Sequence, residues 1–300
     1  MQSEEINLLE NSLNIRLLNE NKNRKESEYL AVRKFSSYKI EEYEEIKKKV
    51  KQDSKTFDII YSFLSKKSKD FNKIDINKAV GPLLPLSFLI ENAYKYKGEY
   101  TNFMNQKYMR LKNYVCNYRT IFGDGNCYYR AVMFRYIELL IFNKKIDYLK
   151  FLIIDIYKSF EKEEVTKRSL FPEINPLLFT KMMIIILEEL EKNDIIKAHQ
   201  AFYILLSSKF FDLSLVLYLR FILYDYIKNN EKKLYLEKFP VLIGNLLPSI
   251  YEKEGVFDFN SFYTNYLLKM FIPAEKIIIY LTPFVLGINL DVVLFDDNED

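Results

Sequence analysis

Histidine, cysteine and glycine are scarce in this 300-residue sequence, and the first two shortages exclude whole classes of site. One histidine, His199, and two cysteines, Cys116 and Cys127, are too few for a zinc site of ordinary ligand number or for a disulfide framework. We therefore expect no metal and no other cofactor. The absence of a disulfide framework favours a reducing compartment, which we take to be the cytoplasm, with the nucleus as the alternative.

A long uncharged apolar run is also missing. The first ten residues, MQSEEINLLE, carry acid where a signal peptide would carry base. The most apolar segment, 201–227, contains Lys209, Asp212, Arg220 and Asp225, which predicts a buried pair of helices and not a membrane span. The net charge of +3 comes from basic residues interleaved with acidic ones. We expect neither a membrane nor a nucleic acid as partner.

The few glycines gather in front of a cysteine. Only seven occur in the sequence, and Gly123 and Gly125 closely precede Cys127. Apolar residues then recur at helical spacing, which predicts a helix that begins near Cys127; they are Tyr129, Val132, Met133, Tyr136, Ile137 and Leu140. Free amides of the first turn and the positive end of the helix dipole favour a thiolate, and the same amides can hold an oxyanion. This geometry suits a nucleophile, although a cysteine can also be a small apolar filler.

The string GDGNCYYRAV, residues 123–132, resembles the Asp-Gly-Asn-Cys box of the OTU cysteine proteases. It is most similar to the otubain branch, whose members remove ubiquitin from proteins. The resemblance implies that Cys127 is the nucleophile, that Asp124 is the acidic residue of the box, and that ubiquitin or polyubiquitin chains are the partners. Arg119 fits the pattern that leads into the box. Backbone amides around Gly125 and Asn126 would hold the oxyanion. Asp124 could shape the loop by accepting backbone N–H bonds, or it could steady the oxyanion site indirectly.

The sequence divides near residue 79. Residues 1–78 are rich in Lys, Glu, Asn and Ser, which predicts a charged helical or flexible extension, with a solvated helix face over 41–51. A second ubiquitin-binding element is the alternative for this extension. Pro82 and Pro85 end any preceding helix. The otubain-like protease domain is then predicted over 79–300.

Within that domain the pattern predicts an α+β fold, mainly helical and papain-like, with a small β-sheet against which the Cys127 helix packs. Helices are expected over 147–160, 178–190, 195–206, 211–227 and 275–286. We assign no chemistry to 211–227, because it is apolar on nearly every face. The last helix contains Pro283, which should kink it, and Gly287 should cap it. Strands are expected over 114–122 and 288–294.

The sequence has no histidine at the position where the resemblance places the general base. In otubains a histidine on the final strand plays this role, but here the only histidine is His199, on a predicted helix, where a surface or packing role is expected. A base is needed because a helix N-terminus stabilises an anion by only about 0.3–1 kcal/mol. We favour a deubiquitinase whose His-bearing hairpin is missing from the sequence, since the strand over 288–294 needs a neighbour. The alternatives are a pseudoenzyme that binds ubiquitin without cleaving it, and a helical scaffold in which the box is a coincidence.

Overall fold

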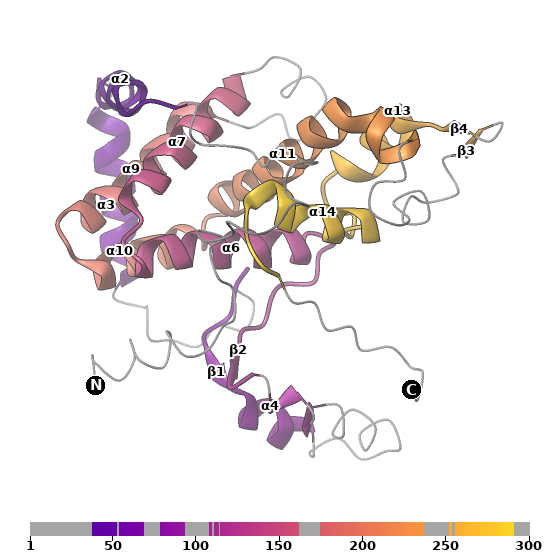
Figure 1. The fold of residues 1–300 in the computed structure, drawn as a ribbon. Coiled ribbons are helices and arrows are strands. Elements are labelled where there is room, and N and C mark those ends of the chain that lie inside the picture. The colour runs from indigo at the N-terminus through magenta and orange to yellow at the C-terminus, as the bar shows by residue number, and fades with distance from the viewer. Residues whose placement is uncertain are drawn as a thin grey trace, which may run out of the picture.

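The computed structural model describes residues 38–52, 54–68, 79–93, 108–109, 111–113, 115–161, 175–236, 252–253 and 256–290. Most of these residues are helical (Figure 1). The helices are α2 (Ile40–Lys51), α3 (Ser54–Ser68), α4 (Leu86–Ala93), α6 (Cys127–Phe142), α7 (Ile146–Glu161), α9 (Pro176–Glu191), α10 (Ile195–Leu205), α11 (Lys209–Leu236), α13 (Phe259–Phe262), the π-helical turn η4 (Tyr263–Leu267) and α14 (Lys276–Leu286). The mainly helical α+β class predicted from the sequence is confirmed.

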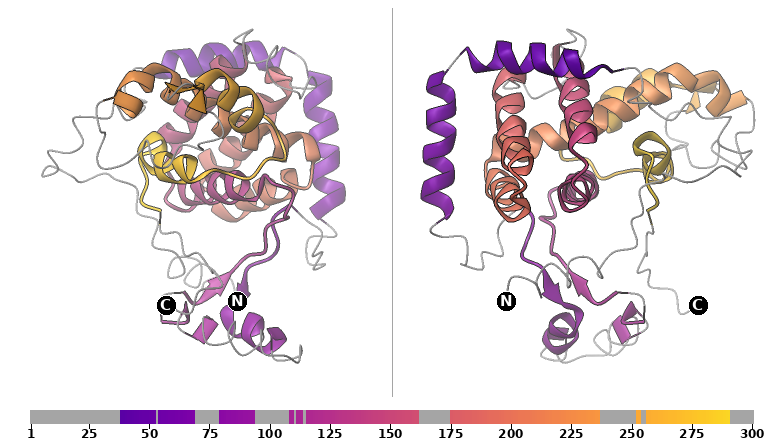
Figure 2. Two further views of the ribbon diagram at one scale, coloured as in Figure 1. Left: turned by 90° about the vertical axis from the view of Figure 1, so that its right-hand side faces the viewer. Right: turned by 60° about the vertical axis from the view of Figure 1, so that its left-hand side comes forward.

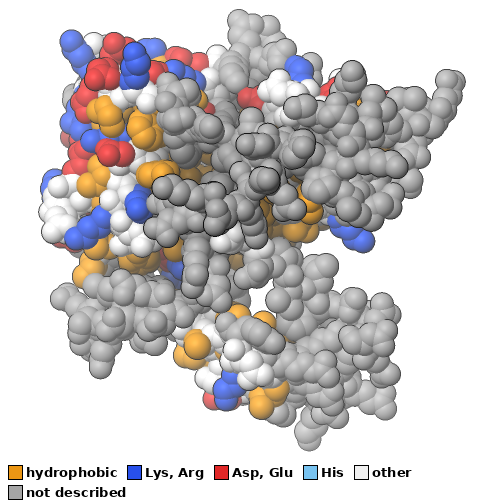
Figure 3. All heavy atoms as spheres, viewed as in Figure 1, with side chains coloured by type: hydrophobic (Ala, Val, Ile, Leu, Met, Phe, Trp, Pro, Cys, Tyr) orange, Lys and Arg blue, Asp and Glu red, His pale blue; other side chains and the backbone are white. Residues whose placement is uncertain are grey.

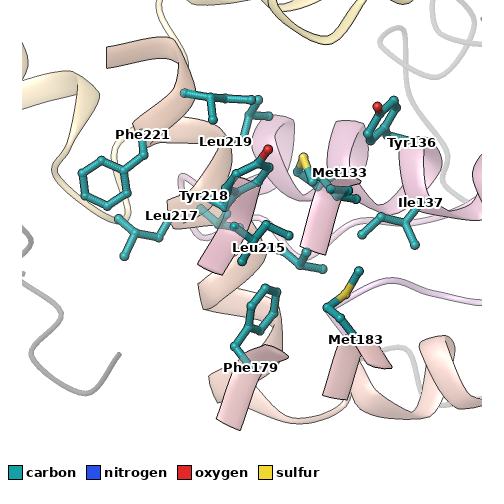
Figure 4. Close-up of a cluster of buried hydrophobic side chains, with 14 of the residues drawn as sticks. Met133, Tyr136, Ile137, Phe179, Met183, Leu215, Leu217, Tyr218, Leu219 and Phe221 are labelled. Atoms are coloured by element: carbon teal, nitrogen blue, oxygen red, sulfur yellow. The ribbon is translucent and has the colours of Figure 1, made fainter. Parts of the chain in front are cut away.

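Helix α6, which begins at Cys127, lies in the middle of the molecule and packs against α7, α10 and α11 (Figure 1). Its residues from Val132 to Ile141 are all buried, because neighbouring helices surround it on every side. Figure 4 shows part of the core, with Met133, Tyr136 and Ile137 of α6, Phe179 and Met183 of α9, and Leu215, Leu217, Tyr218, Leu219 and Phe221 of α11. Most of the helix that carries the cysteine is therefore buried in the core.

Local sequence signals account for several helix ends. The Asn175 side chain accepts a hydrogen bond from Leu178 N at 3.0 Å, with Pro176 in the first turn of α9. Asp194 caps α10 in the same way. The helices predicted over 147–160, 178–190 and 195–206 are confirmed to within two residues, whereas α11 extends beyond the predicted 211–227 at both ends.

Two short antiparallel strands, β1 (Leu84–Pro85) and β2 (Asn117–Tyr118), project from the helical body together with α4 (Figure 2). Leu84 pairs with Tyr118, and a further bridge joins Val80 to Ile121. The predicted strand over 114–122 is present in shortened form. The prolines near residue 80 were expected only to end a helix, but Pro85 closes a strand, a position where its missing N–H is tolerated. A second hairpin pairs β3 (Glu252–Lys253) with β4 (Val256–Phe257).

Helix α2, from the predicted extension, packs against α7 and α9. Tyr43, Ile46 and Val50 are buried in the same core cluster as α6. The opposite side of α2 is solvated, and Lys, Arg, Asp and Glu side chains mingle on that part of the surface (Figure 3, upper left). The boundary at residue 79 stays a prediction, and residues 1–37 and 69–78 lie outside the described part of the chain.

The C-terminal part is partly described. Helix α14 contains Pro283 and ends at Leu286, and Gly287 follows in the left-handed conformation, as predicted for the cap (φ 66°). Ile288 is buried, but residues 291–300 lie outside the described residues, so the strand over 288–294 stays a prediction. Among the described helices, no single one combines the length and apolar composition of a membrane span.

Candidate active site

The turn before Cys127 depends on one of its two glycines. Gly125 has φ +80°, and a Cβ atom placed there would lie 2.2 Å from the backbone oxygen of Phe271. A Cβ atom on Gly123 would meet nothing within 4 Å. The turn delivers the chain into α6 with Cys127, partly buried, as its first residue. Glycine is therefore required at 125, where the backbone is left-handed and crowded, but not at 123.

Asp124 braces this turn. Its carboxylate accepts a hydrogen bond from the backbone N of Asn126 at 2.9 Å and two from Arg130, at 3.0 Å and 2.8 Å. Burial raises the pKa of this carboxyl, but the bonds from Arg130 and Asn126 outweigh it and hold the pKa below its ordinary value. Asp124 is thus an ionised acceptor of hydrogen bonds within the loop.

Arg130 connects the turn to α11. Its Nε and Nη2 donate to Asp212 at 2.7 Å and 2.9 Å, and its Nη1 also donates to the carbonyl of Phe122 at 2.9 Å. Burial raises the pKa of Asp212, and its bonds to Arg130 only partly offset that effect. One guanidinium therefore holds two carboxylates. Helix α11, to which we assigned no chemistry, therefore supports the cysteine turn through Asp212 and Arg130.

A second arginine of α11 reaches the same turn. Arg220, fully buried, donates from Nη2 to Asn126 Oδ1 at 3.0 Å and to the carbonyl of Ile272 at 2.7 Å. It also donates to the carbonyls of Tyr266 and Leu267, and its guanidinium lies 3.8 Å from the ring centroid of Tyr129. The signal in the sequence was a charged residue within an otherwise apolar helix, which burial makes costly unless it is bonded.

The side chain of Asn126, like its backbone, takes part in the hydrogen bonds of the cysteine turn. Asn126 is fully buried, and its Oδ1 accepts bonds from Arg220 and from the backbone N of Phe271, the latter at 3.0 Å. Its own backbone N donates to Asp124. That amide is engaged within the turn, so the prediction that Asn126 N–H holds the oxyanion needs correction. The backbone amides of Gly125 and Cys127 remain the candidates for an oxyanion site.

His199 lies far from the cysteine. Its Nε2 is 3.0 Å from Glu138 Oε1, and its ring packs 4.9 Å from that of Phe142. Glu138 stands eleven positions after Cys127 on α6, which places it roughly 16 Å along the helix axis. Arg119 also bonds Glu138, at 3.1 Å, and not the cysteine turn. The packing role predicted for His199 is confirmed.

A partly buried cysteine that opens a central helix, behind a turn braced by a carboxylate, suits a nucleophile. The family model described as peptidase C65, otubain, matches residues 72–240, more than half of the chain. The protein therefore belongs to the otubain family, which confirms the resemblance seen in the sequence.

Solved structures of OTUB1 complexes are also similar to this chain. The ceOTUB1–ubiquitin aldehyde–UBC13~Ub complex has 19% identity and a TM-score of 0.46, and the match covers 75% of this chain and 79% of that one. The h/ceOTUB1–ubiquitin aldehyde complexes with UBCH5B~Ub and UBC13~Ub have 20% identity and TM-scores of 0.47 and 0.48. They cover 76% and 77% of this chain, and 80% and 79% of those chains. No curated protein sequence matches. The family assignment rests on the otubain model alone.

Proposed function

We propose that this chain is a thiol isopeptidase that hydrolyses the bond between the C-terminus of ubiquitin and a substrate lysine. The observation that carries the proposal is the Asp-Gly-Asn-Cys turn of an otubain, with Asp124 bonded into it and Cys127 at the first position of α6. Cys127 Sγ attacks the carbonyl carbon, and the lysine amine departs with the proton that the thiol has lost. Water then hydrolyses the resulting thioester, which releases the ubiquitin C-terminus and restores the thiol. Membership of the otubain family, whose members remove ubiquitin from proteins, supports this substrate.

The rest of the turn keeps this geometry fixed. Asn126, Arg130 and Arg220 are buried and bonded, so the amides of Gly125 and Cys127 are oriented before a substrate arrives. Such preorganisation is the largest contribution to oxyanion stabilisation in many enzymes. The group that takes the thiol proton is neither Asp124, which is bonded to Arg130, nor His199, which is bonded to Glu138.

One observation favours a second candidate, a ubiquitin-binding protein without hydrolytic activity. The single histidine of the sequence is bonded to Glu138, roughly 16 Å from the start of α6. Without an imidazole beside the thiol, proton transfer to the departing amine loses its usual donor. Ubiquitin would still bind, since binding depends on surface contacts and not on the thiol.

Cys127→Ser tests both candidates, with Cys116→Ser as the matched control. Cys116 is exposed and lies outside the cysteine turn, so its substitution should be silent. Turnover of a fluorogenic ubiquitin substrate should disappear in Cys127→Ser, while calorimetry still detects ubiquitin binding. Binding without turnover in the wild type would select the second candidate. Absence of both binding and labelling by an electrophilic ubiquitin probe would reject both, and turnover retained by Cys127→Ser would reject Cys127 as the nucleophile.

A further inference from the structure

Phe271 has a backbone conformation that no helix end explains. Three described residues other than glycine have a positive φ: Lys144, Asn193 and Phe271. Lys144 and Asn193 directly follow the C-caps of α6 and α9, where the left-handed conformation commonly ends a helix. Phe271, with φ 66°, lies in the turn between η4 and α14. A bulky side chain is unfavourable there, and strain of this kind is concentrated at functional sites.

The turn before Cys127 holds Phe271 in this conformation. The backbone N of Phe271 donates to Asn126 Oδ1 at 3.0 Å, and its carbonyl oxygen lies against Gly125. The next carbonyl, that of Ile272, accepts a bond from Arg220 at 2.7 Å. Asn126 and Arg220 are both fully buried. The backbone of Phe271 is therefore fixed beside the residues that lead into Cys127.

The side chain of Phe271 is not part of the described core. It is 49% exposed, whereas Met270 before it is buried, and it is absent from the core cluster and from the partly buried side chains packed against that cluster. Glycine would satisfy the same left-handed backbone without strain. An exposed aromatic ring held by a strained backbone beside the cysteine turn indicates a contact with something other than this chain.

We propose that Phe271 is a substrate-contacting residue, whose ring binds an apolar side chain of the extended segment that brings the scissile carbonyl to Cys127. The inference rests on the proposed function and makes that segment the C-terminal tail of ubiquitin. The Phe271 carbonyl lies against Gly125, two positions before Cys127. Because the backbone is already ordered, binding of the tail does not lose free energy in ordering this loop.

Phe271→Gly separates this role from folding. The variant keeps the left-handed turn, so we expect unchanged or greater resistance to urea. In a Cys116→Ser background, iodoacetamide should alkylate Cys127 at the wild-type rate. The rate of labelling by an electrophilic ubiquitin probe should fall roughly 10-fold, as expected for the loss of one apolar contact. Phe271→Tyr retains the ring and should restore the rate. Phe88→Ala, which removes a ring of similar exposure (47%) on α4, is the matched control and should label as the wild type does.

Three outcomes would overturn the inference. Labelling of Phe271→Gly by the ubiquitin probe at the wild-type rate would show that the ring contacts no substrate. A parallel loss of iodoacetamide alkylation would show that Phe271 positions the thiol instead. If the wild type reacts with iodoacetamide at Cys127 but not with the ubiquitin probe, the proposed function fails, and the inference fails with it. Labelling of Phe271→Gly at the wild-type rate would overturn the inference but leave the proposed function intact.

Discussion

Gly123 and Gly125 differ in backbone conformation and in what surrounds them. Gly123 has an open position for a side chain and an ordinary φ. Gly125 is left-handed, and the backbone of Phe271 occupies the place that its Cβ atom would take. Alanine at 125 would have to adopt a left-handed backbone and also displace a backbone carbonyl, which is not a flexible group. The pair therefore offers a direct test of the cysteine turn.

We predict that Gly125→Ala lowers the free energy of unfolding by about 2–4 kcal/mol, because left-handed strain and overpacking add. Labelling of Cys127 by an electrophilic ubiquitin probe should fall with it. Gly123→Ala should change neither quantity. Urea denaturation and gel-based labelling measure them, and equal effects of the two substitutions would contradict the described turn.

Asn126 provides a second residue-level prediction. Alanine would leave Arg220 Nη2, which is buried, without one acceptor, and the backbone N of Phe271, which is partly buried, without its partner. Each unsatisfied donor costs about 1–3 kcal/mol, so Asn126→Ala should destabilise the protein by roughly 2–5 kcal/mol. Asn126→Asp keeps an acceptor and adds a charge opposite the arginine, and should cost less. Urea denaturation gives the ranking, which would be contradicted if Asp were the more damaging substitution.

At the scale of elements, Glu138 joins three parts of the chain. Its carboxylate bonds Arg119 beside β2 at 3.1 Å, Arg135 one turn earlier on α6 at 2.7 Å, and His199 of α10 at 3.0 Å. Burial disfavours the ionised form, but the bond from His199 and the charges of Arg119, His199 and Arg135 outweigh it, and the pKa falls to about 2. The cluster fixes β2 and α10 against the far half of α6.

This pKa predicts a pH-dependent stability. A carboxyl whose pKa falls from 4.5 to about 2 on folding stabilises the folded state above pH 4.5, and the effect is lost as the pH falls toward 2. The shift corresponds to about 3 kcal/mol at neutral pH. Glu138→Gln should be less stable than the wild type by about that amount at pH 7, and the difference should shrink between pH 4.5 and pH 2. Urea denaturation across this range measures it, and a difference independent of pH would refute the interpretation.

At the scale of the whole molecule, Tyr43 links α2 to the core that α6, α7 and α9 share. Tyr43 is fully buried, its ring lies 5.5 Å from the ammonium groups of Lys47 and Lys150, and it belongs to the core cluster that includes α6, α7 and α9. Its hydroxyl finds no hydrogen-bond partner within the described part of the chain. The ring contributes to stability, whereas the hydroxyl does not.

Accordingly, Tyr43→Ala should lower the free energy of unfolding by about 3–5 kcal/mol, as cavities left by large aromatic side chains do. Tyr43→Phe should be neutral or stabilising, because it removes a buried polar group that lacks a partner. Calorimetry should show one cooperative transition in both variants. A separate low-temperature transition, altered alone by Tyr43→Ala, would mean that α2 folds independently of the core.

The sequence by itself determined what depends on neighbouring positions along the chain. Helical spacing from Tyr129 to Leu140 located α6, the glycine turn located its start, and the Asp-Gly-Asn-Cys string indicated the otubain family. Helix caps such as Asn175 and Gly287 are local in the same sense. Periodicity and capping depend on contacts within one helix, so a single sequence reveals them.

Only the tertiary structure decided which distant residues support Cys127. Asp212 is bonded to Arg130 across 82 positions, and Arg220 and Phe271 are bonded to Asn126 across 94 and 145. Asp212 and Arg220 lie on α11, which is apolar on nearly every face. The pattern of α11 therefore indicates packing and does not reveal what these two buried charges bind. Gly125 differs from Gly123 because a carbonyl from a later turn approaches only one of them. Such contacts arise when separate elements pack together, and no local pattern in the sequence records which partners will meet.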